Sequence, residues 1–402
     1  MQIQRTDLEN LRKGVPPVDP DLLKAVTLGR DVWLDYMAEH YLFNYIADGG
    51  SKVKVLVGSS GCGKSHLLRS VETDARNLGY ETVFLSARTT LARLNNLPSL
   101  YQDIAGRIDL SGMIMGLCLR VANQLGVEKA RYSNDRLLLK ILMEDGMSNG
   151  DAIREIREAT GAAFLHADLG PSFKTFVWGV VKSQLCDDEG EGNRKKDLYL
   201  KWIVGQKLTR EEQQATNLFE QLDRSNARYW LNSLISLLRL ANHKGLVVIV
   251  DDLEVMTERS LQTGRYLYRP NAVKDTCELF RQIIDDCEIL NNFLLLLAGR
   301  PPFIEDLTRG FQSYEALWMR LQSGLVLSSH FNPFSDMVNV DAHYQEAGGV
   351  RFVREMEQRL KTVLGEAGYQ RTNQPDLPYD PEEGLLRRTV RAVAKLYKED
   401  PA

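Results

Sequence analysis

The chain has 402 residues, of which 44% are hydrophobic and 26% are charged, and its formal net charge is −4. These values are ordinary for a soluble globular protein of about two to three domains, or of one domain with large insertions. They exclude a protein that coats nucleic acid by bulk positive charge, although a local basic patch is compatible with them. The five cysteines are widely spread and form no CxxC pair, so they indicate neither a zinc site nor a disulfide framework.

Nothing in the sequence resembles a targeting or membrane segment. The N-terminal stretch MQIQRTDLENLRKG is polar and lacks the apolar core of a signal peptide. The longest apolar run, Phe293–Ala298, is too short to span a bilayer. Scattered cysteines suit a reducing compartment. We therefore expect a soluble, cytoplasmic protein without a membrane partner.

The first part of the chain predicts a short arm followed by the start of an α/β unit. Residues 1–20 favour a short polar helix and a turn, and residues 29–48 carry apolar positions at helical spacing. Lys52–Val57 and Glu81–Ser86 are typical of strands. Between them a glycine-rich turn leads into a helix that Gly79 ends. This strand–loop–helix–strand order is how α/β domains begin.

The middle of the chain changes character and then returns to strands. Residues 105–241 have helical periodicity and no convincing strand, so we expect a large helical insertion. Within it, the charged segment Cys186–Asp197 predicts a solvated loop. Leu246–Val250 and Phe293–Ala298 are continuous apolar runs, typical of strands covered on both faces of a parallel sheet, and Gly324–Ser328 is a weaker candidate.

The C-terminal part predicts helices, and the whole chain predicts an α/β protein. Residues 345–369 and 382–397 have helical character, and a linker rich in Pro, Asp and Asn at 373–381 separates them. The expected fold class is a P-loop NTPase (AAA+-like) parallel sheet with a large helical insertion and a C-terminal helical lid. The expected parts are an N-terminal helical arm at 1–28, a core from 29–104 and 242–335, the insertion at 105–241, and a lid region at 336–402.

One segment carries specific chemistry, because it matches the pattern GxxxxGK[ST] in full between a strand and a helix. Its residues are Gly58, Ser59, Ser60, Gly61, Cys62, Gly63, Lys64 and Ser65, and His66 follows as a further candidate contact. The glycines let backbone N–H groups point at phosphate oxygens, and the helix N-terminus adds a positive dipole end. Lys64 can bridge the β- and γ-phosphates of ATP, whose hydrolysis leaves ADP, and the Ser65 hydroxyl can ligate Mg²⁺. The alternative is a glycine-rich turn without a ligand.

The second element is the pair of acids that ends the Leu246 strand. Asp251 stands at the carboxyl tip of that strand, where ligands gather in such sheets, and is the expected partner of Mg²⁺. Asp252 stands where a carboxylate polarises the attacking water, one methylene shorter than the commoner Glu, and Glu254 is a substitute candidate. Capping of a strand or helix by the Asp pair stays open. No guanine-reading NKxD motif is visible, so ATP is favoured over GTP.

Several arginines are candidates for contact with a nucleotide. Arg300 follows the Phe293 strand and can sense the γ-phosphate. Arg309 and Arg320 can point into a neighbouring subunit's nucleotide site and stabilise transition-state charge there. Arg387, on a C-terminal helix with two further arginines, can reach the nucleotide from a lid. For each of them a surface role in ion pairs stays open.

The motifs together resemble those of AAA+ ATPases of the origin-recognition-like branch. The likeness is closer to the BREX-type ATP-binding proteins, the BrxD-like family of bacterial phage-defence gene clusters. Besides the P-loop, it is carried by Gly29–Asp31 (GRD), Glu9–Pro17 (ENLRKGVPP), Tyr199–Gly205 (YLKWIVG), Gly245–Glu254 (GLVVIVDDLE), Gly299–Pro301 (GRP) and Leu317–Leu321 (LWMRL).

The resemblance covers most of residues 5–335 and implies an ATP-hydrolysing AAA+ subunit of a multi-protein anti-phage defence system. It implies ATP and Mg²⁺ as cofactors, a helicase or nuclease as partner, action on or near DNA, and a homo-oligomer. Asp252 stands where that family has Glu, Arg300 where it has Thr, and no Pro-Arg signature accompanies Arg387. A slow-hydrolysing ATP-dependent switch or scaffold that recruits effector proteins is the alternative. A small-molecule kinase is disfavoured, because no substrate-pocket signature is visible.

Overall fold

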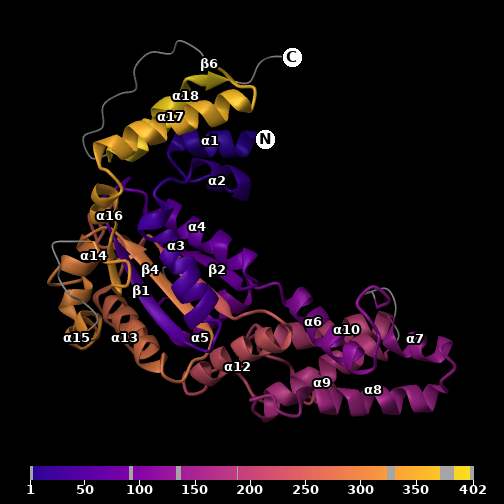
Figure 1. Ribbon diagram of the computed structural model, residues 1–402. Helices are drawn as coiled ribbons and strands as arrows, with labels where there is room; N and C mark the ends of the chain where they lie inside the picture. The colour runs from indigo at the N-terminus through magenta and orange to yellow at the C-terminus, as the bar shows by residue number, and fades with distance from the viewer. Residues whose placement is uncertain are drawn as a thin grey trace.

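A five-stranded parallel sheet lies at the centre of the protein (Figure 1). The computed structural model describes residues 3–89, 94–132, 137–187, 189–323, 331–371 and 384–398. The sheet has the order β2-β3-β4-β1-β5, and each of its strand pairs is parallel. Its strands are β1 (Ser51–Val57), β2 (Glu81–Ser86), β3 (Leu246–Asp251), β4 (Phe293–Gly299) and β5 (Met337–Asn339).

The two central strands are apolar throughout because both faces of the sheet are covered. All residues of β3 and β4 are buried, as expected for a parallel sheet between helical layers. The four strands predicted at the positions of β1 to β4 are confirmed. The strand β5 was not predicted, since three residues carry too little pattern, and it lies just beyond the expected core boundary at 335. The candidate strand at 324–328 lies outside the described residues.

Alternate residues of each strand face opposite layers. Val247 and Ile249 pack with α4 (Lys64–Asn77) and the segment before β1. Val248 and Val250 pack with the layer that contains α12 (Ala227–Leu240) and α13 (Pro270–Asp286). The helix predicted at 29–48 is instead a series of short elements, because the helical hydrogen-bond pattern changes along the segment from 3₁₀ to α to π. They are η1 (Arg30–Val32, 3₁₀), α3 (Leu34–Tyr36) and η2 (Met37–Tyr45, π).

The chain between β2 and β3 is helical in all the regular structure that the described residues contain, at the position expected for an insertion. These helices extend away from the sheet (Figure 1) and hold aromatic side chains in their core, with the Trp202 and Trp230 rings 4.5 Å apart. The helices are α5 (Leu97–Ala105), α6 (Leu110–Gln124), α7 (Leu138–Glu144), α8 (Asn149–Phe164), α9 (Pro171–Leu185), α10 (Glu189–Ile203), α11 (Arg210–Thr216) and α12 (Ala227–Leu240).

The predicted loop at Cys186–Asp197 was wrong over most of its length. Helix α10 begins at Glu189, because its charges sit on a helix surface where they pair at short spacing. The Lys195 Nζ lies 2.8 Å from the Glu191 carboxylate and 2.9 Å from that of Asp187. High charge therefore marked an exposed helix face and not an irregular segment.

After β3 the chain forms further helices, whose apolar side chains join the hydrophobic core on one face of the sheet. Two short 3₁₀ turns, η3 (Leu253–Met256) and η4 (Phe311–Ser313), join them. None of the described helices is long and apolar enough to cross a membrane. The α-helices of this part are α13 (Pro270–Asp286), α14 (Pro302–Glu305) and α15 (Glu315–Ser323).

The two ends of the described chain pack into one helical unit above the sheet (Figure 1). Helices α1 (Arg5–Lys13) and α2 (Pro20–Val26) share a separate hydrophobic core with α17 (Val350–Glu366) and α18 (Leu385–Lys395). The helix predicted over 345–369 is divided, since Gly348 and Gly349 have φ of 111° and 57° and end α16 (Val340–Glu346) before α17 begins. A small antiparallel pair completes the unit, formed by β6 (Gln370–Arg371) and β7 (Tyr397–Lys398).

Candidate functional site

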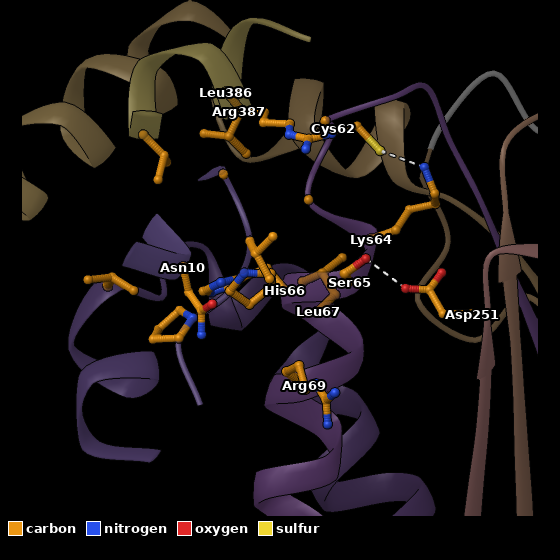
Figure 2. A pocket seen from close by; sticks show the side chains of 18 of the residues that line it. Asn10, Cys62, Lys64, Ser65, His66, Leu67, Arg69, Asp251, Leu386 and Arg387 are labelled. Carbon is orange, nitrogen blue, oxygen red and sulfur yellow. Dashed lines mark hydrogen bonds between the residues drawn. The ribbon is translucent and has the colours of Figure 1, made fainter. Parts of the chain in front are cut away.

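A cavity of about 630 Å³ lies between the carboxyl edge of the sheet and the helical unit above it. The β1–α4 loop and the ends of β2 and β3 form its floor, and side chains from α1, α2, α16, α17 and α18 line its other walls. Leu386 and Arg387 of α18 lie above the loop in Figure 2. The cavity therefore brings residues from both ends of the chain to the loop that carries the GxxxxGK[ST] pattern.

The β1–α4 loop depends on glycine at two positions. Gly61 and Gly63 have φ of 74° and 106°, in the left-handed region that favours glycine. A Cβ atom on Gly61 would also lie 2.7 Å from the Cβ of Arg387 on α18. Helix α4 begins at Lys64, so its free N–H groups face the cavity. Of the predicted loop residues, Gly58, Ser59 and Ser60 do not line the cavity but shape the loop beneath it.

The Lys64 ammonium group is held by its own loop. Its Nζ atom donates to the carbonyl oxygens of Gly58 at 2.7 Å and Ser59 at 2.8 Å, and lies 3.9 Å from the Cys62 sulfur (Figure 2). Burial raises the pKa of the Cys62 thiol, so this side chain is a neutral packing partner. The lysine is preorganised at the rim of the loop, within reach of an anion that enters the cavity.

Ser65 and Asp251 form a hydrogen-bonded pair on the cavity floor. The Ser65 hydroxyl donates to Asp251 Oδ2 at 2.7 Å (Figure 2), and the Asp252 N–H donates to Asp251 Oδ1 at 2.8 Å. Burial raises the pKa of Asp251, and the nearby Asp252 charge adds to the effect against the opposing hydrogen bond from Ser65. A hydroxyl beside a buried carboxylate is a set of hard oxygen donors, and these residues fit a Mg²⁺ ion.

Asp252 is held in a constrained backbone conformation at the end of β3. Its φ is 65°, which is uncommon outside glycine and tolerated best by Asn and Asp. The Ser86 hydroxyl, at the end of β2, donates to Asp252 Oδ2 at 2.6 Å, and the Arg88 Nε lies 3.9 Å from Oδ1. Both Asp252 and Ser86 line the cavity, so this carboxylate faces the space beside Lys64.

Glu254 and Arg300 contact each other and lie outside the cavity lining. The buried Glu254 carboxylate accepts hydrogen bonds from the Arg300 backbone N–H and Nε, both at 3.1 Å. Arg300 also pairs with Glu258, whose carboxylate receives two further bonds from Arg88 at 2.7 and 2.8 Å. We call Arg88, Glu254, Glu258 and Arg300 the arginine–carboxylate network. Neither Glu254 nor Arg300 lines the cavity.

Sequence reasoning missed two members of this network, Arg88 and Glu258. Arg88 follows β2 as Arg300 follows β4, and the carboxyl ends of parallel strands meet at one edge of the sheet. The position of Arg88 just after a predicted strand was the feature of the sequence that could have identified it. Arginine proximity lowers the pKa of the Glu258 carboxyl, with the Arg88 hydrogen bonds as the main cause. The Glu258 carboxyl therefore favours its ionised form, and the network borders Asp252 through Arg88, whose Nε lies 3.9 Å from Asp252 Oδ1.

Asp341 is a further contact of the loop that the sequence did not reveal. Its carboxylate accepts from the Ser59 backbone N–H at 2.8 Å and from the Ser59 hydroxyl at 2.6 Å. It follows β5, which pairs with β1 and was not predicted. The first half of the loop is thereby tied to α16, and the second half is left facing the cavity.

His66 lines the cavity from the first turn of α4. Its Nε2 lies 2.9 Å from the Thr27 hydroxyl, and burial lowers the pKa of His66 to about 4. A neutral imidazole in this position contributes a hydrogen-bonding group and no charge. His343 on α16 is a second buried imidazole of the cavity wall, with its pKa also lowered to about 4.

The remaining predicted arginines separate into three situations. Arg387 lines the cavity, and its Nη2 donates to the Lys13 carbonyl at 3.2 Å. Arg320 lies on α15, away from the cavity lining, and pairs with Asp285 of α13. Arg309 is buried and donates to the carbonyls of Met256 and Tyr268, so it holds loops together inside its own subunit.

A glycine loop between a strand and a helix, facing an acid at the tip of a nearby parallel strand, defines an α/β protein of the P-loop nucleotide-binding class. The chain belongs to the family of BREX system ATP-binding proteins BrxC/D, whose family model matches residues 2–340. The resemblance inferred from the sequence segments is thereby confirmed. Comparison with curated proteins and with solved structures found no match. Family membership implies ATP binding and a role in a phage-defence system with other components.

Proposed function

We propose that the protein is a Mg²⁺-dependent ATPase, an AAA+ subunit that hydrolyses ATP in the work of its defence system. The observation that carries the proposal is the Ser65–Asp251 pair at 2.7 Å beside the Lys64 loop. A hydroxyl, a buried carboxylate and an ammonium group converge there on one cavity. This combination suits a triphosphate with its metal.

The shape of the cavity supports a nucleotide of this size. Ligand pockets of about 300–1,000 Å³ hold molecules of comparable bulk, and this cavity measures about 630 Å³. The phosphates would lie on the α4 N-terminus, and the base would reach the apolar part of the lining. That part includes Val26, Leu28, Phe352, Met356 and Leu360.

The proposed mechanism is in-line attack of water on the γ-phosphate. Ser65 and Asp251 would hold the Mg²⁺ ion, which when bound supplies positive charge to the phosphate oxygens. Lys64 would exchange its loop carbonyls for the β- and γ-phosphate oxygens. Asp252 would orient the attacking water, because it lines the cavity, whereas Glu254 is taken up by Arg300. The Ser86 hydroxyl fixes the direction of the Asp252 carboxylate.

Two arginines would complete the charge stabilisation. Arg387 would contact the phosphates from the helical unit, which we propose acts as a lid formed by α1, α2, α17 and α18. Arg320 would act in a second copy's site, since it lies away from the cavity of its own chain. This requires a homo-oligomer and exchange of its Asp285 partner for phosphate. An ATPase rate per subunit that stays constant as protein concentration rises from dilute to concentrated would contradict the inter-subunit role.

Two substitutions test the central proposal. Lys64→Ala should abolish binding of a fluorescent ATP analogue. Asp252→Asn should leave that binding intact and reduce phosphate release by about 100-fold or more, because positioned general bases contribute about that much. Glu254→Gln is the control, and its turnover should remain above that of Asp252→Asn. Full ATPase activity in Lys64→Ala would remove the proposal, and the reverse order of the two acid variants would transfer the water-orienting role to Glu254.

A slow ATP-dependent switch is the second candidate, and two observations favour it. The Asp252 carboxylate is short and tethered to Ser86, and Arg300 is engaged by two carboxylates. The protein would then hold ATP and recruit a helicase or nuclease according to its nucleotide state. Turnover measured with and without DNA and partner separates the two candidates. A switch hydrolyses slowly under all conditions, whereas a motor accelerates when its substrate is present.

A further inference from the structure

A short hairpin follows the η3 turn, which comes after β3 and Asp252 in the chain. The Leu267 N–H donates to the Glu258 carbonyl at 2.9 Å, and the Ser260 N–H donates to the Arg265 carbonyl at 2.7 Å. Arg259 and Tyr266 form an antiparallel bridge between these bonds. Leu261 lies at the tip with its side chain fully exposed. The segment is thus a short two-stranded ribbon with one bridged residue pair, and its residues 261–267 are all exposed to solvent.

The hairpin is stiffened by its own aromatic and arginine side chains. The Arg259 guanidinium lies 4.1 Å and that of Arg309 3.9 Å from the Tyr266 ring centroid. Arg259 also donates to the Gly264 carbonyl at 3.2 Å and to the Tyr266 hydroxyl at 3.0 Å. Because Arg309 is buried and bonded to the hairpin base at Tyr268, the ribbon is anchored to the core. Its shape is preorganised for a partner.

Positive charge gathers on this ribbon and on the helix that follows it. Arg259, Arg265, Arg269 and Lys274 are all exposed. Within the described residues, the side chains of Arg265, Arg269 and Lys274 make no hydrogen bond or ion pair. We call Arg259–Leu267 together with Arg269 and Lys274 the hairpin surface. Its charge stands out on a chain whose formal net charge is −4.

The acids near the hairpin surface neutralise little of this charge. Glu258, at the root of the ribbon, is paired with Arg88 and Arg300 on its far side. Asp306 accepts hydrogen bonds from the Thr308 and Arg309 backbone. Asp275, next to Lys274 on α13, is exposed and offsets one positive charge. A surplus of arginine therefore remains along the exposed edge.

We propose that the hairpin surface binds the phosphate backbone of a nucleic-acid strand. Planar guanidinium groups match phosphate geometry. A nucleic-acid groove admits a two-stranded ribbon, and an apolar tip such as Leu261 can wedge against base steps. An acidic peptide shares the charge but needs neither the ribbon nor the tip. The inference goes beyond the proposed function by naming a surface for nucleic acid, and it rests on that function only for the link to ATP.

Glu258 supplies that link. It is the first residue of the hairpin ladder, and its carboxylate belongs to the arginine–carboxylate network that borders Asp252. A nucleic-acid strand that displaces the ribbon would therefore also displace the side chains that border Asp252. The path between the ribbon and Asp252 is short, because Glu258 belongs to both the ribbon and the arginine–carboxylate network.

The test measures binding of fluorescent duplex and single-stranded DNA by anisotropy over a series of salt concentrations. Charge reversal in Arg265→Glu with Arg269→Glu should weaken binding of the preferred form by about tenfold or more and lower the salt slope by about two. The neutral pair Arg265→Gln with Arg269→Gln should fall between this variant and the wild type. The matched control, Arg154→Glu with Arg157→Glu, reverses two exposed arginines on α8 at the far end of the helical group (Figure 1) and should bind as the wild type does.

Several outcomes would overturn the inference. They are wild-type protein that binds neither DNA form, a hairpin variant that binds normally, an equal loss in the α8 control, or poly-glutamate that competes as well as DNA of equal charge. Each protein is also titrated with a fluorescent ATP analogue. Normal nucleotide affinity with lost DNA binding supports the hairpin surface, and it shows that the variant is folded. Failure of wild-type nucleotide binding would instead remove the proposed function and leave the DNA measurement readable by itself.

Discussion

Asp251 is a buried carboxylate whose ionised form the fold disfavours. Its raised pKa means that the native state holds the proton more firmly than the unfolded chain does, so at neutral pH its charge subtracts from the free energy of unfolding. A bound cation would reverse this balance. If Asp251 holds Mg²⁺ as proposed, the site loses some stability in the nucleotide-free protein and recovers it when the metal binds.

Asp251→Asn should therefore leave the Tm of the nucleotide-free protein unchanged or raise it, because the buried charge is removed and the polar shape is kept. The same variant should lose the rise in Tm that Mg²⁺ and ATP produce together. Thermal unfolding with and without these ligands measures both effects. Ser65→Ala is the control, since it keeps the charge and should lose the metal effect without the gain in stability. A large fall in the Tm of nucleotide-free Asp251→Asn would contradict this account.

At the residue scale, the sequence predicted what is contiguous and missed what tertiary structure assembles. The loop from Gly58 to Ser65 is one continuous segment, and Asp251 ends a strand that its run of apolar residues predicts. Asp341 and Glu258 reach the site through hydrogen bonds across distant segments, and no local pattern marks them. Glu254 and Arg300 were placed at the correct edge of the sheet, yet they turn toward each other and away from the cavity lining.

Helix α18 is the element that closes the cavity against the β1–α4 loop. Its N-cap residue, Gly384, donates its N–H to the Ser60 carbonyl at 3.1 Å. Arg387, one turn later, lines the cavity. The loop and this helix are therefore in direct backbone and side-chain contact.

Arg387→Ala should weaken ATP binding by about tenfold or more, because a charge-assisted hydrogen bond to phosphate is worth about 1.5–3 kcal/mol. ADP should be affected less than ATP if the contact is with the terminal phosphate. Isothermal titration with both nucleotides measures the difference. Arg388→Ala provides the matched control, since Arg388 lies on the same helix outside the cavity lining. Equal effects of the two variants would argue against a phosphate contact.

Gly61→Ala should displace α18 from the loop. The added Cβ would meet Arg387 at 2.7 Å, and the residue has a φ of 74°. Hydrogen exchange of residues 385–395 should rise in this variant. Gly368→Ala is the control, because Gly368 has a φ of 85° and a Cβ added there would meet no heavy atom within 4 Å. The control therefore carries similar backbone strain of about 1 kcal/mol without a clash. Unchanged exchange in Gly61→Ala would mean that α18 does not rest on the loop.

At the scale of elements, length and charge explain the errors of sequence prediction. β5 has three residues, too few for a pattern. Helix α10 begins in a charged stretch whose ion pairs become visible only on a helix. The long apolar strands β3 and β4, by contrast, were predicted within one residue of their ends, because burial on both faces leaves a continuous signal.

The whole molecule should lose stability in mild acid. Burial lowers the pKa of both His66 and His343 from 6.5 to about 4. The unfolded chain therefore takes up protons between these values that the folded chain does not, and stability falls as the pH drops below 6.5. Thermal unfolding over this pH range measures the loss, which should be smaller in His343→Asn. A pH profile identical to that of the wild type would show that this imidazole accepts a proton in the folded state.

The helical unit above the cavity draws α1 and α2 from one end of the described chain and α17 and α18 from the other. During synthesis, the first two helices leave the ribosome long before their partners exist. At about 5–20 residues per second, the delay is on the order of tens of seconds. Until α18 is synthesised, the nascent protein has the β1–α4 loop but lacks the helix that packs against it and closes the cavity. If the helical unit acts as the proposed lid, we expect firm binding of ATP only after α18 has been synthesised and has packed against α1 and α2.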